Sequence, residues 1–271
     1  MLKLKFKIVC ITILLMAVSV VACRKDKTTE LDTVIAEQES LASVYSDDIQ
    51  NFATEAYDNG SISELKETED KNNPCTTVTK DTINRIVTID FGTNGCIGRD
   101  GRTRKGKIII NYSQQLFWSA GCTHNISFDN YFVNNNQITG TKTVTILTNG
   151  RANRHVESHL NILLANNGGT IIWNCDRTRN QTSGINTANI LDDEYSITGA
   201  ANGTSSNGTN FVFNITNALI RKMICPRHFV QGVIVRQVDN RSDVSIDFGN
   251  GDCDWYATVS KNGVSRQITL R

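Results

Sequence analysis

The sequence lacks the short motifs that assign many enzymes to a reaction. It contains no Gly-x-Ser-x-Gly nucleophile elbow, no phosphate-binding loop and no dinucleotide-binding glycine fingerprint. It has no Cys-x-x-Cys pair either, so a zinc ribbon or a thioredoxin-like motif is unsupported. We therefore assign no catalytic residues, no cofactor and no metal, and we expect a protein that is not an enzyme.

Proline is scarce, and neither sign of charge is in excess. The chain has 28 Lys and Arg against 27 Asp and Glu, and residues 1–22 hold three of the lysines, so the rest carries a net charge of −2. A chain this close to neutral is a poor partner for nucleic acid or for a membrane bound through basic residues. Only Pro74 and Pro226 interrupt a chain rich in Thr, Asn, Gly, Ile and Val, which is typical of strands and turns.

The sequence has no apolar run long enough to span a bilayer. Residues 8–21 are apolar, whereas a spanning helix needs about 20 such residues. The run follows a lysine-rich head and ends at Val20-Val21-Ala22-Cys23, which resembles the signal of bacterial lipoproteins. That resemblance implies that residues 1–22 are removed and that Cys23 is acylated, and two or more acyl chains hold a protein firmly to a membrane. An ordinary secretory signal with an accidental cysteine is the alternative.

The lipoprotein signal also predicts a location. We expect the chain in the cell envelope, lipid-anchored to the outer membrane, on either its periplasmic or its surface face. Residues 23–28 would form the lipidated tether of this anchor. The mixed charges just after Cys23 do not decide between the two faces.

Residues 29–58 are predicted to form an amphipathic helix. Apolar residues recur there at steps of three and four, and Asn59-Gly60 ends the pattern. We expect the apolar stripe to pack on the domain that follows, rather than on a partner or a bilayer surface, because the opposite face is acidic. The acidic residues of that face are Glu37, Glu39, Asp47, Asp48 and Glu55. Residues 59–74 are predicted to be a linker.

Residues 75–271 are predicted to form one all-β domain. Turn signals such as Asn149-Gly150 separate the expected strands and no helical pattern intervenes, which indicates an antiparallel meander, built as a sandwich or as a curved sheet. Residues 200–209 are rich in Gly, Ser and Asn and are predicted to form a loop. The expected strands cover residues 76–81, 85–91, 107–113, 125–133, 137–147, 155–165, 170–177, 195–199, 210–221, 229–238, 243–248, 255–260 and 265–270.

The two ends of this domain repeat one pattern. Ile-Asp-Phe-Gly occurs at residues 89–92 shortly before Cys96, and again at residues 246–249 shortly before Cys253. Each copy follows an opening cysteine, and each cysteine pair flanks a hairpin that brings its thiols within bridging distance. An even number of cysteines in an exported chain favours disulfides. We predict the disulfides Cys75–Cys96 and Cys225–Cys253 from the pattern, and Cys122–Cys175 by elimination.

Three clusters of polar side chains are candidate functional sites. His155-x-Glu157-x-His159 would hold a metal on a helix, but on the expected strand the two histidines lie about 13 Å apart, so a polar sheet face is favoured. Five aspartates near the C-terminal hairpins lack the spacing of a calcium loop and are interpreted as turn residues. A basic hairpin is interpreted as solvated, with binding of an anionic polysaccharide or lipid headgroup as the alternative. The aspartates are Asp239, Asp243, Asp247, Asp252 and Asp254, and the basic residues are Arg99, Arg102, Arg104, Lys105 and Lys107.

Aromatic side chains offer a further possibility. Trp118, Trp173 and Trp255 can stack on sugar rings or fill a core equally well at strand positions. A common exposed face bearing all three would favour carbohydrate binding.

Several features of the chain together resemble exported lipoproteins of Bacteroidota-type genomes. They are the lipoprotein signal, the helix, the Cys-flanked Ile-Asp-Phe-Gly units and the Asp-Gly-Arg-x-Arg-x-Gly hairpin at residues 100–106. That group has no assigned activity, so the resemblance implies an envelope protein and transfers no site residues. We expect a non-catalytic binding or structural lipoprotein that contacts another envelope protein or a glycan. The alternative is a glycan-active hydrolase or lyase, or a carbohydrate-binding surface lipoprotein.

Overall fold

The structure is a computed structural model, which describes residues 27–60, 75–98, 100–187, 189–225, 228–237 and 244–270. The predicted signal, the lipidation site Cys23 and most of the predicted linker lie outside these residues. The same is true of Arg99, Asp239 and Asp243 from the clusters above.

The predicted helix is confirmed as α2 (Lys27–Asn59), whose buried side chains include both apolar and polar residues. Gly60 ends it in the left-handed conformation, with φ 72°, and its N–H donates to the carbonyl oxygen of Ala56 at 3.1 Å. Among the described residues, no helix combines the length and the apolar character that crossing a bilayer requires.

The strands after α2 form one antiparallel meander, so the predicted all-β class is confirmed. In the described part of the chain the sheet has 14 strands, ordered as in the sequence except that the short β3 pairs only with β4. The elements are β1 (Thr77–Asp81), β2 (Ile86–Asp90), β3 (Cys96–Ile97), β4 (Thr103–Tyr112), β5 (Thr123–Val133), β6 (Asn136–Ile146), β7 (Asn153–Leu163), β8 (Thr170–Ser183), the 3₁₀ turn η1 (Ile190–Asp192), β9 (Glu194–Thr204), β10 (Asn210–Lys222), β11 (Gln231–Arg236), β12 (Val244–Asn250), β13 (Tyr256–Lys261) and β14 (Val264–Thr269).

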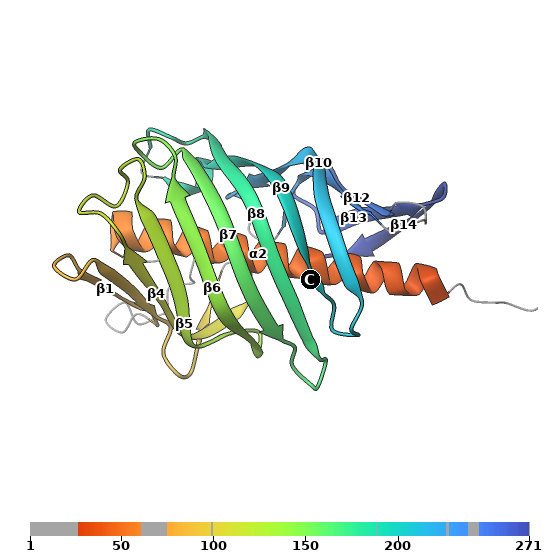
Figure 1. Cartoon of the computed structure of the whole chain (residues 1–271), viewed down its shortest axis with the longest axis horizontal. Helices are drawn as coiled ribbons and strands as arrows, with labels where there is room; N and C mark the ends of the chain where they lie inside the picture. The colour runs from red at the N-terminus through yellow and green to blue at the C-terminus, as the bar shows by residue number, and fades with distance from the viewer. Residues whose placement is uncertain are drawn as a thin grey trace, which may run out of the picture.

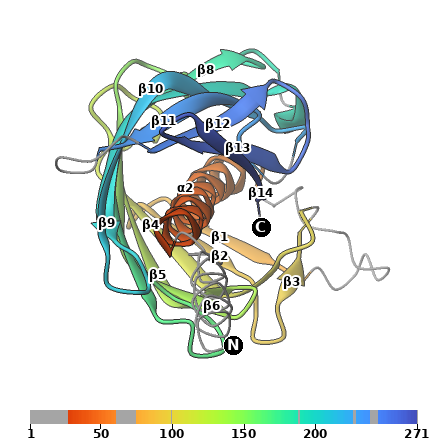
Figure 2. The same cartoon turned by 90° about the vertical axis from the view of Figure 1, so that its right-hand side faces the viewer.

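The sheet is curved, and α2 lies within its concave side. Figure 1 shows α2 running along the length of the molecule behind the strands. Figure 2, viewed nearly along the helix, shows the strands bending around it, with β1 and β14 as unpaired edges. The core forms between α2 and the inner face of this sheet, and α2 contacts β2, β8 and β14. Of the two predicted architectures, the curved sheet is therefore observed.

The predicted loop at residues 200–209 is wrong in its first half. Residues 200–204 continue β9, where Ala201 pairs with Phe213 of β10 and with Cys175 of β8. The inward side chain of Ala201 is buried, so this stretch is stabilised by the sheet on both sides despite its small residues. The turn to β10 is confined to residues 205–209.

The two Ile-Asp-Phe-Gly segments have the same local structure. Asp90 Oδ1 accepts the N–H of Gly92 at 2.9 Å, and Asp247 Oδ1 accepts the N–H of Gly249 at 2.9 Å. Both glycines have positive φ, at 68° and 94°. The phenylalanine between each pair is buried, so each motif anchors the last part of a strand in the core. The sequence repeat therefore corresponds to a structural one.

Each repeat is closed by a cysteine pair, as predicted. The Cα atoms of Cys75 and Cys96 are 5.5 Å apart, and those of Cys225 and Cys253 are 5.3 Å apart, both within the range of a disulfide. Disulfides of this kind indicate an oxidising compartment outside the cytoplasm.

The third predicted disulfide, Cys122–Cys175, is not formed in the structure. Both cysteines are buried and free. Cys122 precedes β5 and Cys175 lies in β8, so β6 and β7 stand between them, and the step across three strand spacings alone is about 14 Å. A disulfide needs Cα atoms within about 7 Å. Elimination failed because it assumed that every thiol must be paired.

Candidate functional site

The most unusual feature of the interior is a set of ion pairs between α2 and the sheet, which we call the interior ion-pair network. Its acids are Glu39, Asp47 and Asp48 of α2 and Asp100 of the turn before β4. Its bases are Arg102, which directly precedes β4, Arg104 of β4, Arg177 and Arg179 of β8, and Arg221 of β10. All of these side chains are buried.

Asp48 is the centre of the network. Its carboxylate accepts from Arg102 Nη1 at 3.3 Å, from Arg104 Nη2 at 3.0 Å and from Arg221 Nη2 at 3.1 Å. Asp100 adds a second carboxylate to Arg104, 2.5 Å away. Burial alone would raise the pKa of Asp100, but the hydrogen bond and charge of Arg104, with Arg102, bring that pKa below its ordinary value. The ion pair between Arg104 and Asp100 is therefore ionised at neutral pH.

Asp47, one residue earlier, faces another pair of arginines. Its carboxylate lies 3.1 Å from Arg179 Nε and 3.3 Å from Arg221 Nε. Arg221 thus bridges both aspartates and also donates to the carbonyl oxygen of Cys225 at 3.0 Å. A single guanidinium from β10 connects the helix to the second disulfide unit.

Glu39 completes the network and lies nearer the N-terminus of α2 than Asp47. It accepts from Arg177 Nη2 at 2.9 Å and from the indole Nε1 of Trp173 at 2.6 Å. Ser43 donates to Glu39 at 2.8 Å and accepts from Arg177 Nη1 at 3.0 Å. Burial raises the pKa of Glu39, and the charge of Arg177 and these hydrogen bonds oppose that rise.

These contacts correct two expectations from the sequence. The acidic face of α2 does not lie away from the sheet, because Glu39, Asp47, Asp48 and Glu55 are all buried. The basic hairpin is solvated only in part, since Arg102 and Arg104 are buried against the helix whereas Lys105 and Lys107 are partly exposed. A buried charge is tolerated only when it is paired and hydrogen-bonded, and each face supplies the partners of the other.

A second interior cluster places an amine beside two hydroxyl groups. Lys142 of β6 donates from Nζ to Ser46 Oγ at 2.8 Å and to Ser158 Oγ at 3.3 Å, and the two hydroxyl oxygens are 3.1 Å apart. Burial lowers the pKa of Lys142 to about 8. An amine of this kind can in principle take a proton from a serine. The adjoining cavity measures only ≈ 20 Å³, room for about one water molecule, so the cluster is a packed interior and offers no space for a substrate.

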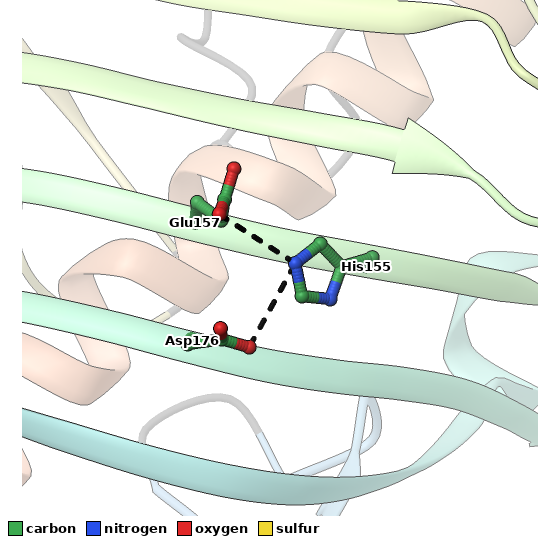
Figure 3. Close-up of side chains that lie close together, drawn as sticks. All are labelled: His155, Glu157 and Asp176. Carbon is green, nitrogen blue, oxygen red and sulfur yellow. Dashed lines mark ion pairs between the residues drawn. The ribbon is translucent and has the colours of Figure 1, made fainter.

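One group of side chains on the outer face of the sheet does bring metal-ligand types together. His155 and Glu157 of β7 lie beside Asp176 of β8, and the imidazole Nε2 is 3.8 Å from Glu157 Oε1 and 3.7 Å from Asp176 Oδ1 (Figure 3). His159, the other histidine of the sequence motif, is separate and its Nδ1 lies 3.0 Å from Asn174 Oδ1. The expected strand is confirmed, and it keeps the two histidines apart as predicted.

Sequence reasoning missed the role of Asp176 because it comes from the neighbouring strand. Glu157 pairs in register with Asp176, and only this register brings a third donor to the pair on β7.

The burial of the interior arginines, by contrast, could have been predicted from the sequence. Arg177 and Arg179 share the alternation of the inward-facing Trp173, which predicts that they too point inward.

The three tryptophans do not share an exposed face. Trp173 is fully buried against Glu39. Trp118 packs on Phe117 and Tyr57 and donates to Asp58 Oδ1 at 2.7 Å. Trp255 is 45% exposed. The common face that would favour carbohydrate stacking is therefore not present.

Two of the aspartates near the C-terminal hairpins act in turns. Asp247 caps the N–H of Gly249, and Asp254 Oδ1 accepts the N–H of Tyr256 at 3.0 Å. These two carboxylates are used by the backbone, as the sequence predicted.

Comparisons of the chain with protein families, curated proteins and solved structures gave no match.

Proposed function

We propose that this chain is a lipid-anchored protein of the cell envelope with a non-catalytic binding or structural role. The observation that carries the proposal is the position of α2. This helix begins at Lys27, four residues after the predicted lipidation site Cys23, and it is also the element that the sheet encloses.

This arrangement links the anchor directly to the core. The three residues between Cys23 and the helix span at most about 11 Å when fully extended. Acyl chains on Cys23 would therefore hold the curved sheet close to the membrane, with its outer face and its loops available to a second envelope component. The two cysteine pairs at disulfide distance support an envelope location.

The filled interior favours binding or scaffolding over catalysis. The acids and arginines of the interior ion-pair network are engaged with one another, and the cavity beside Lys142 holds about one water molecule. Contacts with an envelope protein or a glycan would then use the outer surface. The partner is expected to recognise a face rich in Thr and Asn, such as Thr141, Thr143 and Asn174.

The proposal is tested by replacing the predicted lipidation site in the full chain. Cys23→Ser is expected to abolish acylation and to leave the signal uncut, as measured by metabolic labelling with a fatty acid and by intact-mass spectrometry. Cys10→Ser, which removes the other cysteine of the N-terminal segment, is the matched control and should behave as the parent. Unchanged labelling and processing in Cys23→Ser would overturn the proposal.

A further inference from the structure

The outer face of β7 and β8 carries a compact donor set that the packing of the sheet does not explain. His155 and Glu157 are two residues apart on one strand, so their side chains point to the same side. Asp176 faces Glu157 directly across the strand pair. Figure 3 shows the imidazole edge directed toward both carboxylates. Within the described residues, the imidazole nitrogen of His155 and one carboxylate oxygen each of Glu157 and Asp176 all lie within 4.8 Å of one another.

The distances fit a metal ion more closely than they fit hydrogen bonds. The imidazole Nε2 is 3.8 Å from Glu157 Oε1 and 3.7 Å from Asp176 Oδ1, too far for a hydrogen bond. Two donors of a tetrahedral zinc site, each about 2.0–2.1 Å from the metal, are about 3.4 Å apart. Movements of a few tenths of an ångström in exposed side chains would bring both imidazole–carboxylate distances to this value.

The charges around the group also favour a cation. Two carboxylates placed directly opposite each other on neighbouring strands repel. The next residues in register are Thr143 on β6 and Ala200 on β9, which carry no charge. The arginines of β8 at 177 and 179 point to the interior, so they are directed away from this face. The ion pairs that Glu157 and Asp176 make in the described structure are both with His155.

Access and rigidity are both suitable. The side chains are 31% exposed for His155, 52% for Glu157 and 76% for Asp176, so an ion can reach them from solvent. The strands that carry them lie in the middle of the sheet and are paired on both sides, so the backbone beneath the group is fixed.

We propose that His155, Glu157 and Asp176 bind a divalent transition-metal ion, with zinc as the expected ion. One imidazole and two carboxylates are ligands that zinc accepts, and three protein ligands leave a fourth position for water or for a group from a partner. Calcium and magnesium prefer all-oxygen sites with more ligands, so they should bind far more weakly. The site is independent of the lipid anchor and of the proposed envelope role.

The test is calorimetric titration of the purified, detergent-solubilised full chain with zinc chloride. One ion per chain is expected to bind, with dissociation constants in the micromolar range, while calcium chloride and magnesium chloride give no comparable heat. His155→Asn, Glu157→Gln and Asp176→Asn should each weaken zinc binding at least tenfold. These three side chains are on the surface, and urea unfolding without metal should confirm that each variant remains folded.

His159→Asn supplies the matched control, because His159 is on the same face of the same strand but bonds to Asn174. It should bind zinc as the parent does. Absence of a zinc heat in the parent would overturn the proposal. It would equally be overturned if the three variants bound as the parent, or if His159→Asn weakened binding as much as His155→Asn.

Discussion

Arg177 Nη2 donates to Glu39 Oε1 at 2.9 Å, although 138 positions separate the two residues in the sequence. The glutamate comes from α2 and the arginine from β8, so this pair fastens the helix to the middle of the sheet. Both side chains are almost completely removed from solvent, with exposed fractions of 0% and 6%. Charges in such a place stabilise the fold only as long as both are present.

The first prediction concerns this pair. Glu39→Leu leaves the Arg177 guanidinium buried without its carboxylate, and the free energy of unfolding should fall by about 3–5 kcal/mol. The double variant Glu39→Leu, Arg177→Met removes both charges and should recover most of that loss. Urea unfolding monitored by tryptophan fluorescence measures both effects.

Asp58→Asn is the control for this prediction. Asp58 pairs with Arg151 at the end of the same helix, where both side chains are partly exposed, at 24% and 20%. A pair of that kind contributes about 1 kcal/mol or less. If Asp58→Asn cost as much as Glu39→Leu, or if the double variant were no more stable than the single one, burial of the Glu39 pair would not be the source of its effect.

The sequence predicted the strands, the helix and the cysteine pairs of the two repeats because each of these depends on local patterns. Alternation and Asn-Gly turns define hairpins over a few residues, and Cys75–Cys96 closes one such hairpin. The helix was correctly placed over residues 29–58 for the same reason. Its surroundings were not predictable in this way.

The environment of α2 depends on contacts between residues far apart in the chain. An acidic helix face normally lies in solvent, so Asp47 and Asp48 gave no local sign of burial. Their partners Arg104, Arg179 and Arg221 come from strands that the curvature of the sheet brings together. A single sequence does not show that curvature. The metal-ligand set at His155 was missed for a related reason, since Asp176 joins it through strand register.

The second prediction is a dependence of stability on pH that arises from His124. Its side chain is buried, with Nε2 hydrogen-bonded to the carbonyl oxygen of Phe117 at 2.8 Å, and burial together with the charge of Arg154 lowers the pKa of His124 to about 4. The unfolded chain binds a proton near pH 6.5, whereas the folded chain binds it only near pH 4, so stability is lost as pH falls through this window. Between pH 7.5 and pH 5 the loss should be about 2 kcal/mol.

His124→Gln isolates this contribution. The glutamine side chain does not titrate, so the variant should lose less stability than the parent between the two pH values, whatever its stability at pH 7.5. The measurement is urea unfolding at pH 7.5 and at pH 5.0 for both proteins. Equal losses in the two proteins would show that His124 is not the titrating group.

The third prediction concerns the thiols. Alkylation of the unfolded, non-reduced protein followed by peptide mapping should find Cys122 and Cys175 modified, because both are free in the structure. Cys75 should be linked to Cys96, and Cys225 to Cys253. In the native protein Cys122 and Cys175 should resist alkylation, since both are buried. A peptide linking Cys122 to Cys175 would contradict the free state of these two residues.

The fourth prediction is that the buried amine of Lys142 reduces stability at neutral pH. Burial lowers its pKa from 10.5 to about 8, so below pH 8 the folded protein must hold a positive charge away from water. Between pH 8 and pH 10.5 the folded chain has lost this proton while the unfolded chain keeps it, so stability should rise with pH across this range, by about 3 kcal/mol in total. Lys142→Met should abolish the rise.

At pH 7 the same variant should be at least as stable as the parent. The methionine has a similar length and no charge, and Ser46 and Ser158 remain 3.1 Å apart and can bond to each other. Urea unfolding at pH 7 and pH 9.5 measures both effects, and Lys107→Met is the control because Lys107 is 42% exposed in its pair with Asp90. A loss of more than about 2 kcal/mol at pH 7 in Lys142→Met would mean that hydrogen bonds to the two serines outweigh the burial of the charge.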